Sequence, residues 1–153
     1  MSDIQSLMSG STLRLRKNEP FFATLLLFAD IVIDDSVQTA ATDGRKIYLN
    51  QDYCSSLTNK EFDAVILHEV LHCALLHTSR MRERNKLLWN YAGDIVVNGQ
   101  IRKLEHITLP EGVIIDESLE EYSTEEVYSI LLSKGFEVKD IIFNIDLLEP
   151  DRS

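Results

Sequence analysis

A run of mostly apolar residues extends from Ala64 to Leu76, and apolar side chains would occupy every face of a helix formed there. A helix that is apolar all round is normally buried in the protein core. Upstream, Thr58 and Glu61 have the spacing of a capping box, in which each side chain accepts a hydrogen bond from the other residue's backbone N–H. The pattern predicts a buried helix from about residue 59 to about residue 79.

Segments before this helix have the composition of strands. Residues 31–33 are β-branched, which favours an extended backbone. Asp43 and Gly44 form a pair typical of hairpin turns, so the flanking segments 39–42 and 46–49 are expected to pair as antiparallel strands. This hairpin either covers the helix or offers an edge strand to an extended substrate, and the sequence leaves both interpretations open.

Other segments have helical patterns or helix start signals: residues 2–18, 21–28, 87–104 and 124–134. Pro20 suits the first turn of the second of these helices. Gly93 and Gly99 weaken the third, because glycine lowers helix propensity. Ser123 and Glu126 have the spacing of a second capping box and open the fourth.

The length of the chain and the order of these elements predict the fold class. The chain has 153 residues, which suits one compact domain. We expect an α+β fold in which the long buried helix and the helix after it pack on a small antiparallel sheet or hairpin. This domain should occupy residues 1–135. Residues 136–153, where acidic and apolar side chains alternate, should form a C-terminal tail.

Charge and cysteine content exclude several classes of protein. The net charge is −10, so we expect no basic surface that could neutralise the phosphates of a nucleic acid or of an anionic membrane. The N-terminus lacks the basic segment and apolar core of a signal peptide. Cys54 and Cys73 do not have CxxC spacing. A cytoplasmic protein with reduced thiols and a protein or peptide substrate is expected.

The buried helix contains the HExxH sequence, residues 68–72. Positions four apart lie on one helix face, so His68 and His72 can bind the same metal ion. Glu69 stands beside them, where it can act as a base toward a metal-bound water. Buried ionisable groups are costly unless they are paired or bind a metal. The motif therefore predicts a Zn²⁺ site with Glu69 as the catalytic residue.

A catalytic zinc normally has three protein ligands, and two residues compete to be the third. Asp94 is a lone acid in an apolar run 22 positions after His72, far enough for a turn and an antiparallel helix. His77 faces away from the motif on a continuous helix, so it could bind only if the helix ended early. We expect Asp94, with His77 as the alternative. Asn98 could orient Asp94, and Tyr91 and His77 are candidates for stabilising an oxyanion.

Four segments follow one another in a familiar order: residues 39–45, residues 68–72 continuing to His77 and Arg80, residues 89–94 with Asn98, and residues 109–112. In this order they resemble the bacterial and phage group of metallopeptidase domains that often precede a von Willebrand factor A-like domain. The resemblance spans about residues 20–134 and implies a zincin-like fold and proteolysis. It does not decide the third ligand, because the positions of His77 and Asp94 both belong to the family's pattern.

Two hypotheses follow. The first is a zinc-dependent metalloendopeptidase that uses Glu69 as general base. The second is a catalytically weak or inactive binding or regulatory protein on a zincin scaffold. The chain ends at Ser153 and leaves no room for the second domain of the family, so a protein partner could replace that domain. Glu69 favours the enzyme, since a vestigial site has no need of this acid.

Overall fold

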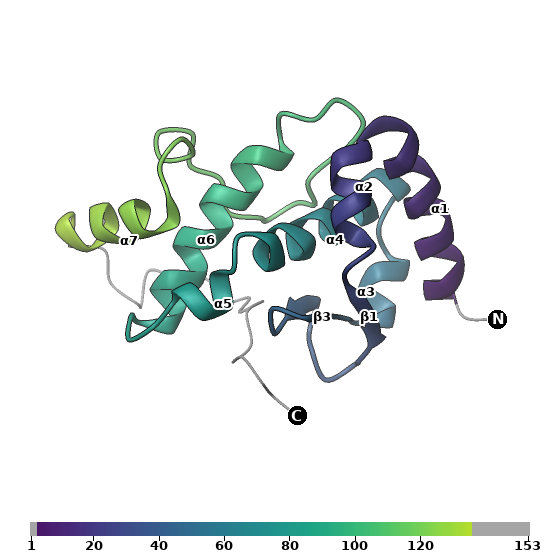
Figure 1. The fold of residues 1–153 in the computed structure, drawn as a ribbon, viewed down its shortest axis with the longest axis horizontal. Helices are drawn as coiled ribbons and strands as arrows, with labels where there is room; N and C mark the ends of the chain where they lie inside the picture. The colour runs from purple at the N-terminus through teal and green to yellow at the C-terminus, as the bar shows by residue number, and fades with distance from the viewer. Residues whose placement is uncertain (1–2, 136–153) are drawn as a thin grey trace.

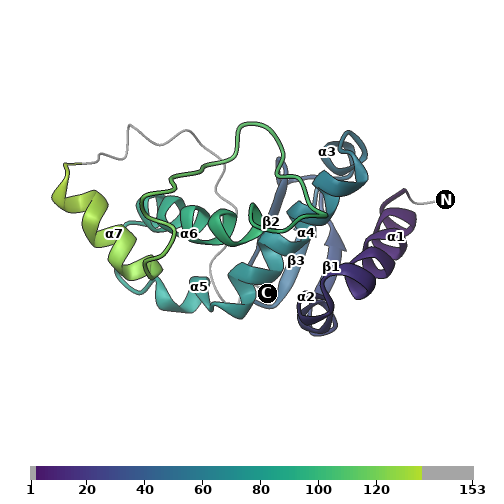
Figure 2. The ribbon, with the colours of Figure 1, turned by 90° about the horizontal axis from the view of Figure 1, so that it is seen from above.

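The computed structural model describes residues 3–135. The long helix α4 (Asn59–Ala74) lies in the middle of the molecule. It packs against α1 (Asp3–Asn18) and α2 (Pro20–Leu26) on one side and α6 (Lys86–Ile101) on the other, and α7 (Thr124–Ser133) packs on α6. Figures 1 and 2 show α1 and α7 at opposite ends of the long axis. The predicted tail, residues 136–153, lies outside the described residues.

A three-stranded sheet lies beside α4 (Figure 2). Its strands are β1 (Asp30–Ile33), β2 (Ala40–Thr42) and β3 (Lys46–Leu49), in the order β1-β3-β2. The predicted hairpin is confirmed, because β2 and β3 pair antiparallel. The sheet is mixed rather than purely antiparallel, since β1 pairs with β3 in parallel. The chain passes from β1 to the far side of the sheet and returns through the hairpin, so β1 and β3 run in the same direction.

The hairpin turn depends on Asp43 and Gly44, as its sequence predicts. The Asp43 Oδ1 accepts hydrogen bonds from the backbone N–H groups of Arg45 and Lys46, at 2.9 and 2.8 Å. Its Oδ2 accepts one from the Tyr48 hydroxyl at 2.9 Å. Gly44 has φ +96°, in the region that glycine adopts without steric cost. The turn is therefore held by a side chain as well as by its backbone.

Both predicted capping boxes are confirmed. Thr58 with Glu61 opens α4, and Ser123 with Glu126 opens α7. The prediction that the HExxH helix is buried is also confirmed, because apolar side chains on every face of α4 belong to the core. The helices and the mixed sheet together confirm the α+β class.

The predicted end of the buried helix is wrong. α4 ends at Ala74, and a separate short helix, α5 (His77–Arg80), follows. Leu76 between them has φ +57°, a left-handed conformation that costs a non-glycine residue about 1–2 kcal/mol. Local propensity favours a continuous helix here. The tertiary contacts of His77 offset the cost, as the site below shows.

Another short helix, α3 (Gln51–Ser55), was not expected from the sequence. The Asn50 side chain caps it by accepting a hydrogen bond from the Tyr53 backbone N–H at 2.8 Å. Five residues are too few to show a helical period, so no pattern could reveal this helix. None of the helices between residues 3 and 135 is apolar over a length that would cross a bilayer.

Candidate active site

Helices α4 and α6 pack against each other and bring three polar side chains together. The Nε2 atoms of His68 and His72 lie 3.0 Å apart. The Asp94 Oδ1 on α6 lies 3.1 Å from each of them. Among the described residues, these three form a group of donor atoms that could hold a metal ion. Sequence reasoning named the same three residues.

The geometry and chemistry of this group suit a divalent transition metal. A tetrahedral ion with bonds of about 2.1 Å holds its ligands about 3.4 Å apart, close to the spacing of the three atoms here. Two imidazole nitrogens and one carboxylate oxygen are also donors that zinc accepts. His72 is fully buried, whereas His68 and Asp94 keep a little exposure, so the group is reachable from one side.

The side chain of Asn98 orients the His68 ring. The Nδ1 of His68 lies 2.8 Å from the Oδ1 of Asn98. The Nδ2 of Asn98 donates to the backbone carbonyl of Ile114 at 2.9 Å. The sequence predicts that Asn98 orients Asp94; in the structure its side chain bonds His68 and Ile114 instead. Asn98 thus connects His68 on α4 to the loop that contains Ile114.

His77 lies behind His72 rather than beside it. α4 does end before His77, which was the condition for His77 to bind the metal. The ring nevertheless contacts His72 through Nδ1, at 2.8 Å from the His72 Nδ1. Its Nε2 lies 2.7 Å from the Thr124 Oγ1. Both ring nitrogens of His77 therefore contact residues other than Asp94.

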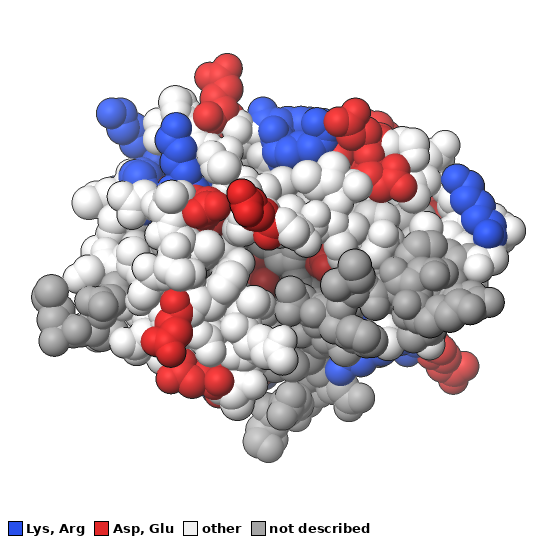
Figure 3. Space-filling view, turned by 180° about the vertical axis from the view of Figure 1, so that it is seen from behind, with Lys and Arg blue, Asp and Glu red and all other residues white. Residues whose placement is uncertain are grey.

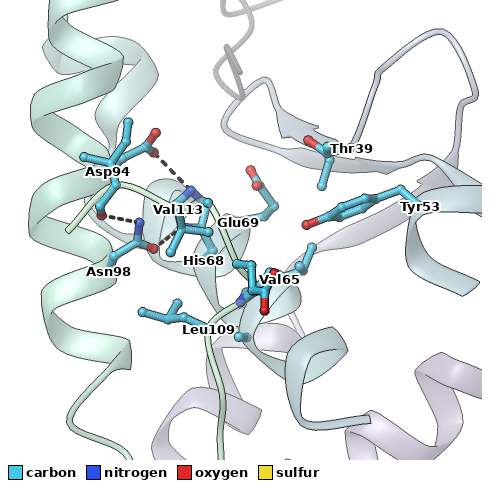
Figure 4. Close-up of a pocket in the computed structure, with 15 residues that line it drawn as sticks. Thr39, Tyr53, Val65, His68, Glu69, Asp94, Asn98, Leu109 and Val113 are labelled. Carbon is cyan, nitrogen blue, oxygen red and sulfur yellow. Dashed lines mark hydrogen bonds and ion pairs between the residues drawn. The ribbon is translucent and has the colours of Figure 1, made fainter. Parts of the chain in front are cut away.

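A cleft of about 190 Å³ opens onto the group. The molecule is hollowed near the centre of the face in Figure 3, and acidic side chains are visible in the hollow and along its rim. The cleft is lined by Thr39, Ala40, Tyr53, Ala64, Val65, His68, Glu69, Asp94, Asn98 and residues 109–114. Glu69 is 2% exposed, and Figure 4 shows its carboxylate on the side of Tyr53 and Thr39. The acid of the HExxH sequence thus reaches the cleft together with His68 and Asp94.

Sequence reasoning missed Tyr53. Figure 4 shows its ring pointing hydroxyl-first into the cleft toward Glu69. Burial is the main cause that raises the pKa of this phenol, and Cys54 raises it further against an opposing effect of His68, so the phenol keeps its proton at neutral pH. Tyr91 and His77, the oxyanion candidates from the sequence, are not among the residues that line the cleft. Tyr53 is presented by α3, which no sequence pattern indicated.

The cysteines stand apart from this chemistry. Both are free thiols. Burial, with a smaller contribution from the Glu69 charge, raises the pKa of Cys54 to about 12. The pKa of Cys73 is also raised, again mainly by burial. A thiol with a raised pKa is a poor nucleophile and a poor metal ligand at neutral pH.

Comparison with known families identifies the kind of domain. A family model described as "Putative metallopeptidase domain" matches residues 7–140. The chain belongs to this family. A metallopeptidase domain is a metal-dependent hydrolase of peptide bonds, and the His68, His72 and Asp94 group offers a place for the metal. No curated protein and no solved structure matches the chain.

Proposed function

We propose that this metallopeptidase domain is a zinc-dependent endopeptidase with a zincin-like fold. The observation that carries the proposal is the position of Glu69. This acid is buried, it lines the cleft, and it lies next in sequence to a histidine whose Nε2 is 3.1 Å from Asp94. Burying an acid costs free energy. Hydrolysis of a peptide bond requires a base that takes a proton from the attacking water, and a buried Glu69 can supply it.

Each residue has a role that follows from its place. His68, His72 and Asp94 would hold the ion. When bound, zinc polarises a carbonyl group and lowers the pKa of its water. Glu69 would accept a proton from water in the cleft and pass it to the leaving amine. The Tyr53 hydroxyl would donate a hydrogen bond to the oxygen of the attacked carbonyl, where negative charge develops.

The lining of the cleft favours a peptide over a nucleic acid. Glu69, Asp94 and Glu111 line it, and no Lys or Arg is among the described residues that do. Such a surface repels phosphates and tolerates neutral or basic peptide segments. Thr39 and Ala40, at the start of the edge strand β2, also face the cleft, which supports the hypothesis that an extended substrate lies along this edge.

Glu69→Gln tests the function directly. The variant keeps the shape of the side chain and loses its basicity, so zinc binding should be unchanged. Cleavage of unfolded protein substrates should fall by about 10²- to 10⁴-fold, the usual contribution of a general base. The measurement is a peptide-cleavage rate on zinc-loaded protein with bound zinc determined in parallel. Equal rates for wild type and Glu69→Gln would support a binding or regulatory protein instead.

A further inference from the structure

We infer that His77 is a positioning residue that orients His72 toward the metal by accepting a hydrogen bond from its Nδ1–H. The inference rests on the metal site of the proposed function and adds a residue outside that site. It replaces the role of third ligand or oxyanion donor that the sequence allowed for His77.

Three buried side chains form a continuous hydrogen-bonded series. His72 and His77 are 0% exposed and Thr124 is 1% exposed. The series runs from the His72 Nδ1 to the His77 Nδ1 at 2.8 Å, and from the His77 Nε2 to the Thr124 Oγ1 at 2.7 Å. It connects α4 to the first residue of α7 across the short helix α5.

The direction of the protons in this series follows from the role of His72. A neutral imidazole carries one ring proton. If His72 presents Nε2 to a metal, its proton is on Nδ1, which must then donate to the His77 Nδ1. His77 consequently carries its proton on Nε2 and donates it to the Thr124 hydroxyl. Metal-binding histidines usually donate their second ring N–H to an acceptor that fixes the ring, and a histidine fills that place here.

The surroundings hold His77 in this position at a cost. Its backbone carbonyl accepts a hydrogen bond from the Trp89 indole at 2.7 Å. A Cβ at Gly93 would lie 3.3 Å from the His77 Nδ1 and 3.4 Å from the His72 Cε1, so only glycine leaves ample room for both rings. The left-handed backbone of Leu76 is what turns His77 back under His72. The strained turn therefore places a hydrogen-bond acceptor, the Nδ1 of His77, behind His72.

Three substitutions separate orientation of His72 from simple packing. His77→Asn places an amide oxygen near the position of Nδ1 and keeps the acceptor for His72. His77→Gln places its polar atoms near the position of Nε2 and keeps the contact with Thr124. His77→Leu fills space and keeps neither. Zinc affinity is measured by competition with a chelator, and stability by thermal unfolding of the metal-free proteins.

We expect His77→Asn to bind zinc within a few-fold of wild type, and His77→Gln and His77→Leu to bind about 10- to 100-fold more weakly, the usual effect of losing such a partner. Equal zinc affinity of the His77→Asn and His77→Gln variants would overturn the inference. It would also be overturned if the zinc affinities of the three variants simply ranked in the order of their thermal stabilities. A protein that binds zinc without cleaving peptides would disprove the proposed function and leave this inference intact. A wild-type protein that binds no divalent metal would overturn both.

Nitrogen NMR of the histidine rings in zinc-loaded wild type gives a test that needs no variant. We expect the proton on Nδ1 of His72 and on Nε2 of His77. A proton on the His77 Nδ1 would reverse the hydrogen bond and overturn the inference.

Discussion

Two side chains at the candidate site, those of His68 and Tyr53, are held in place by neighbouring residues. Asn98 holds His68, and the Asn50 cap starts the helix that presents Tyr53. Such support keeps a side chain in one orientation before the substrate arrives, which is where much of the rate enhancement at an active site originates. At the residue scale, the proposed function would therefore depend on these supporting residues as well as on the residues at the metal group.

Tyr53→Phe tests the oxyanion role at this scale. The change removes only the hydroxyl, so kcat should fall by about 10²- to 10³-fold, the usual loss for one oxyanion donor. KM and zinc affinity should change little. Steady-state kinetics on a fluorogenic peptide gives both parameters. Tyr91→Phe is the matched control, and a larger loss of kcat in that variant than in Tyr53→Phe would contradict the assignment.

At the scale of elements, the hairpin is positioned by its turn. A Cβ at Gly44 would lie 2.5 Å from the Thr78 Oγ1 on α5, so the turn packs closely on the segment that follows the HExxH helix. Asp43 holds the other side of the turn through the hydrogen bonds described above. Since β2 borders the cleft, a displaced turn would move one wall of the candidate site.

The stability contributed by this turn should depend on pH. Burial raises the pKa of Asp43, but hydrogen bonds from Lys46, Arg45 and Tyr48 outweigh burial and lower it. A carboxylate whose pKa is lowered by folding stabilises the protein above its unfolded pKa, about 3.9. That contribution is lost as the pH falls through the lowered folded pKa. Asp43→Asn should therefore destabilise the protein by about 1 kcal/mol at pH 7 and by less in acid.

Urea unfolding of wild type and Asp43→Asn between pH 7 and pH 3 measures the difference in their free energies of unfolding. This difference should become smaller below about pH 4, where Asp43 begins to bind a proton in the unfolded chain. A difference that stays constant across the range would show that the charge of Asp43 does not stabilise the turn.

On the scale of the whole molecule, two hydrophobic clusters meet at the pair α4 and α6. One contains α4 with α1, α2 and the sheet, and the other contains the outer face of α6 with α7. His68 and His72 come from α4 and Asp94 from α6. A metal ion held by these three side chains would join the two helices, and through them the two clusters.

Metal binding should accordingly stabilise the whole fold. Zinc at about 100 times its Kd adds about 2.7 kcal/mol to the free energy of unfolding, which corresponds to a rise in Tm of about 5–10 °C for a domain of this size. Removing zinc with a chelator should reverse the rise, as followed by circular dichroism. Asp94→Ala should gain much less from zinc, and a gain equal to that of wild type would show that Asp94 is not a ligand.

The sequence by itself determined the features that depend on near neighbours in the chain. The two capping boxes, the Asp43–Gly44 turn and the spacing of His68 and His72 all act over three or four residues, and helix and turn geometry are enough to interpret them. Asp94 was a prediction of a different kind, because it depended on an isolated acid in an apolar run and on a separation from His72 that allows an antiparallel helix.

Only the tertiary structure decided the features that join distant segments. Local propensity favours helix through Leu76, and the contacts of His77 with Thr124 and Trp89 override it. The parallel pairing of β1 and the entry of Tyr53 into the cleft likewise depend on elements far apart in the chain. Packing energy gained between such elements can exceed the 1–2 kcal/mol cost of a strained turn, and no pattern within one segment records that gain.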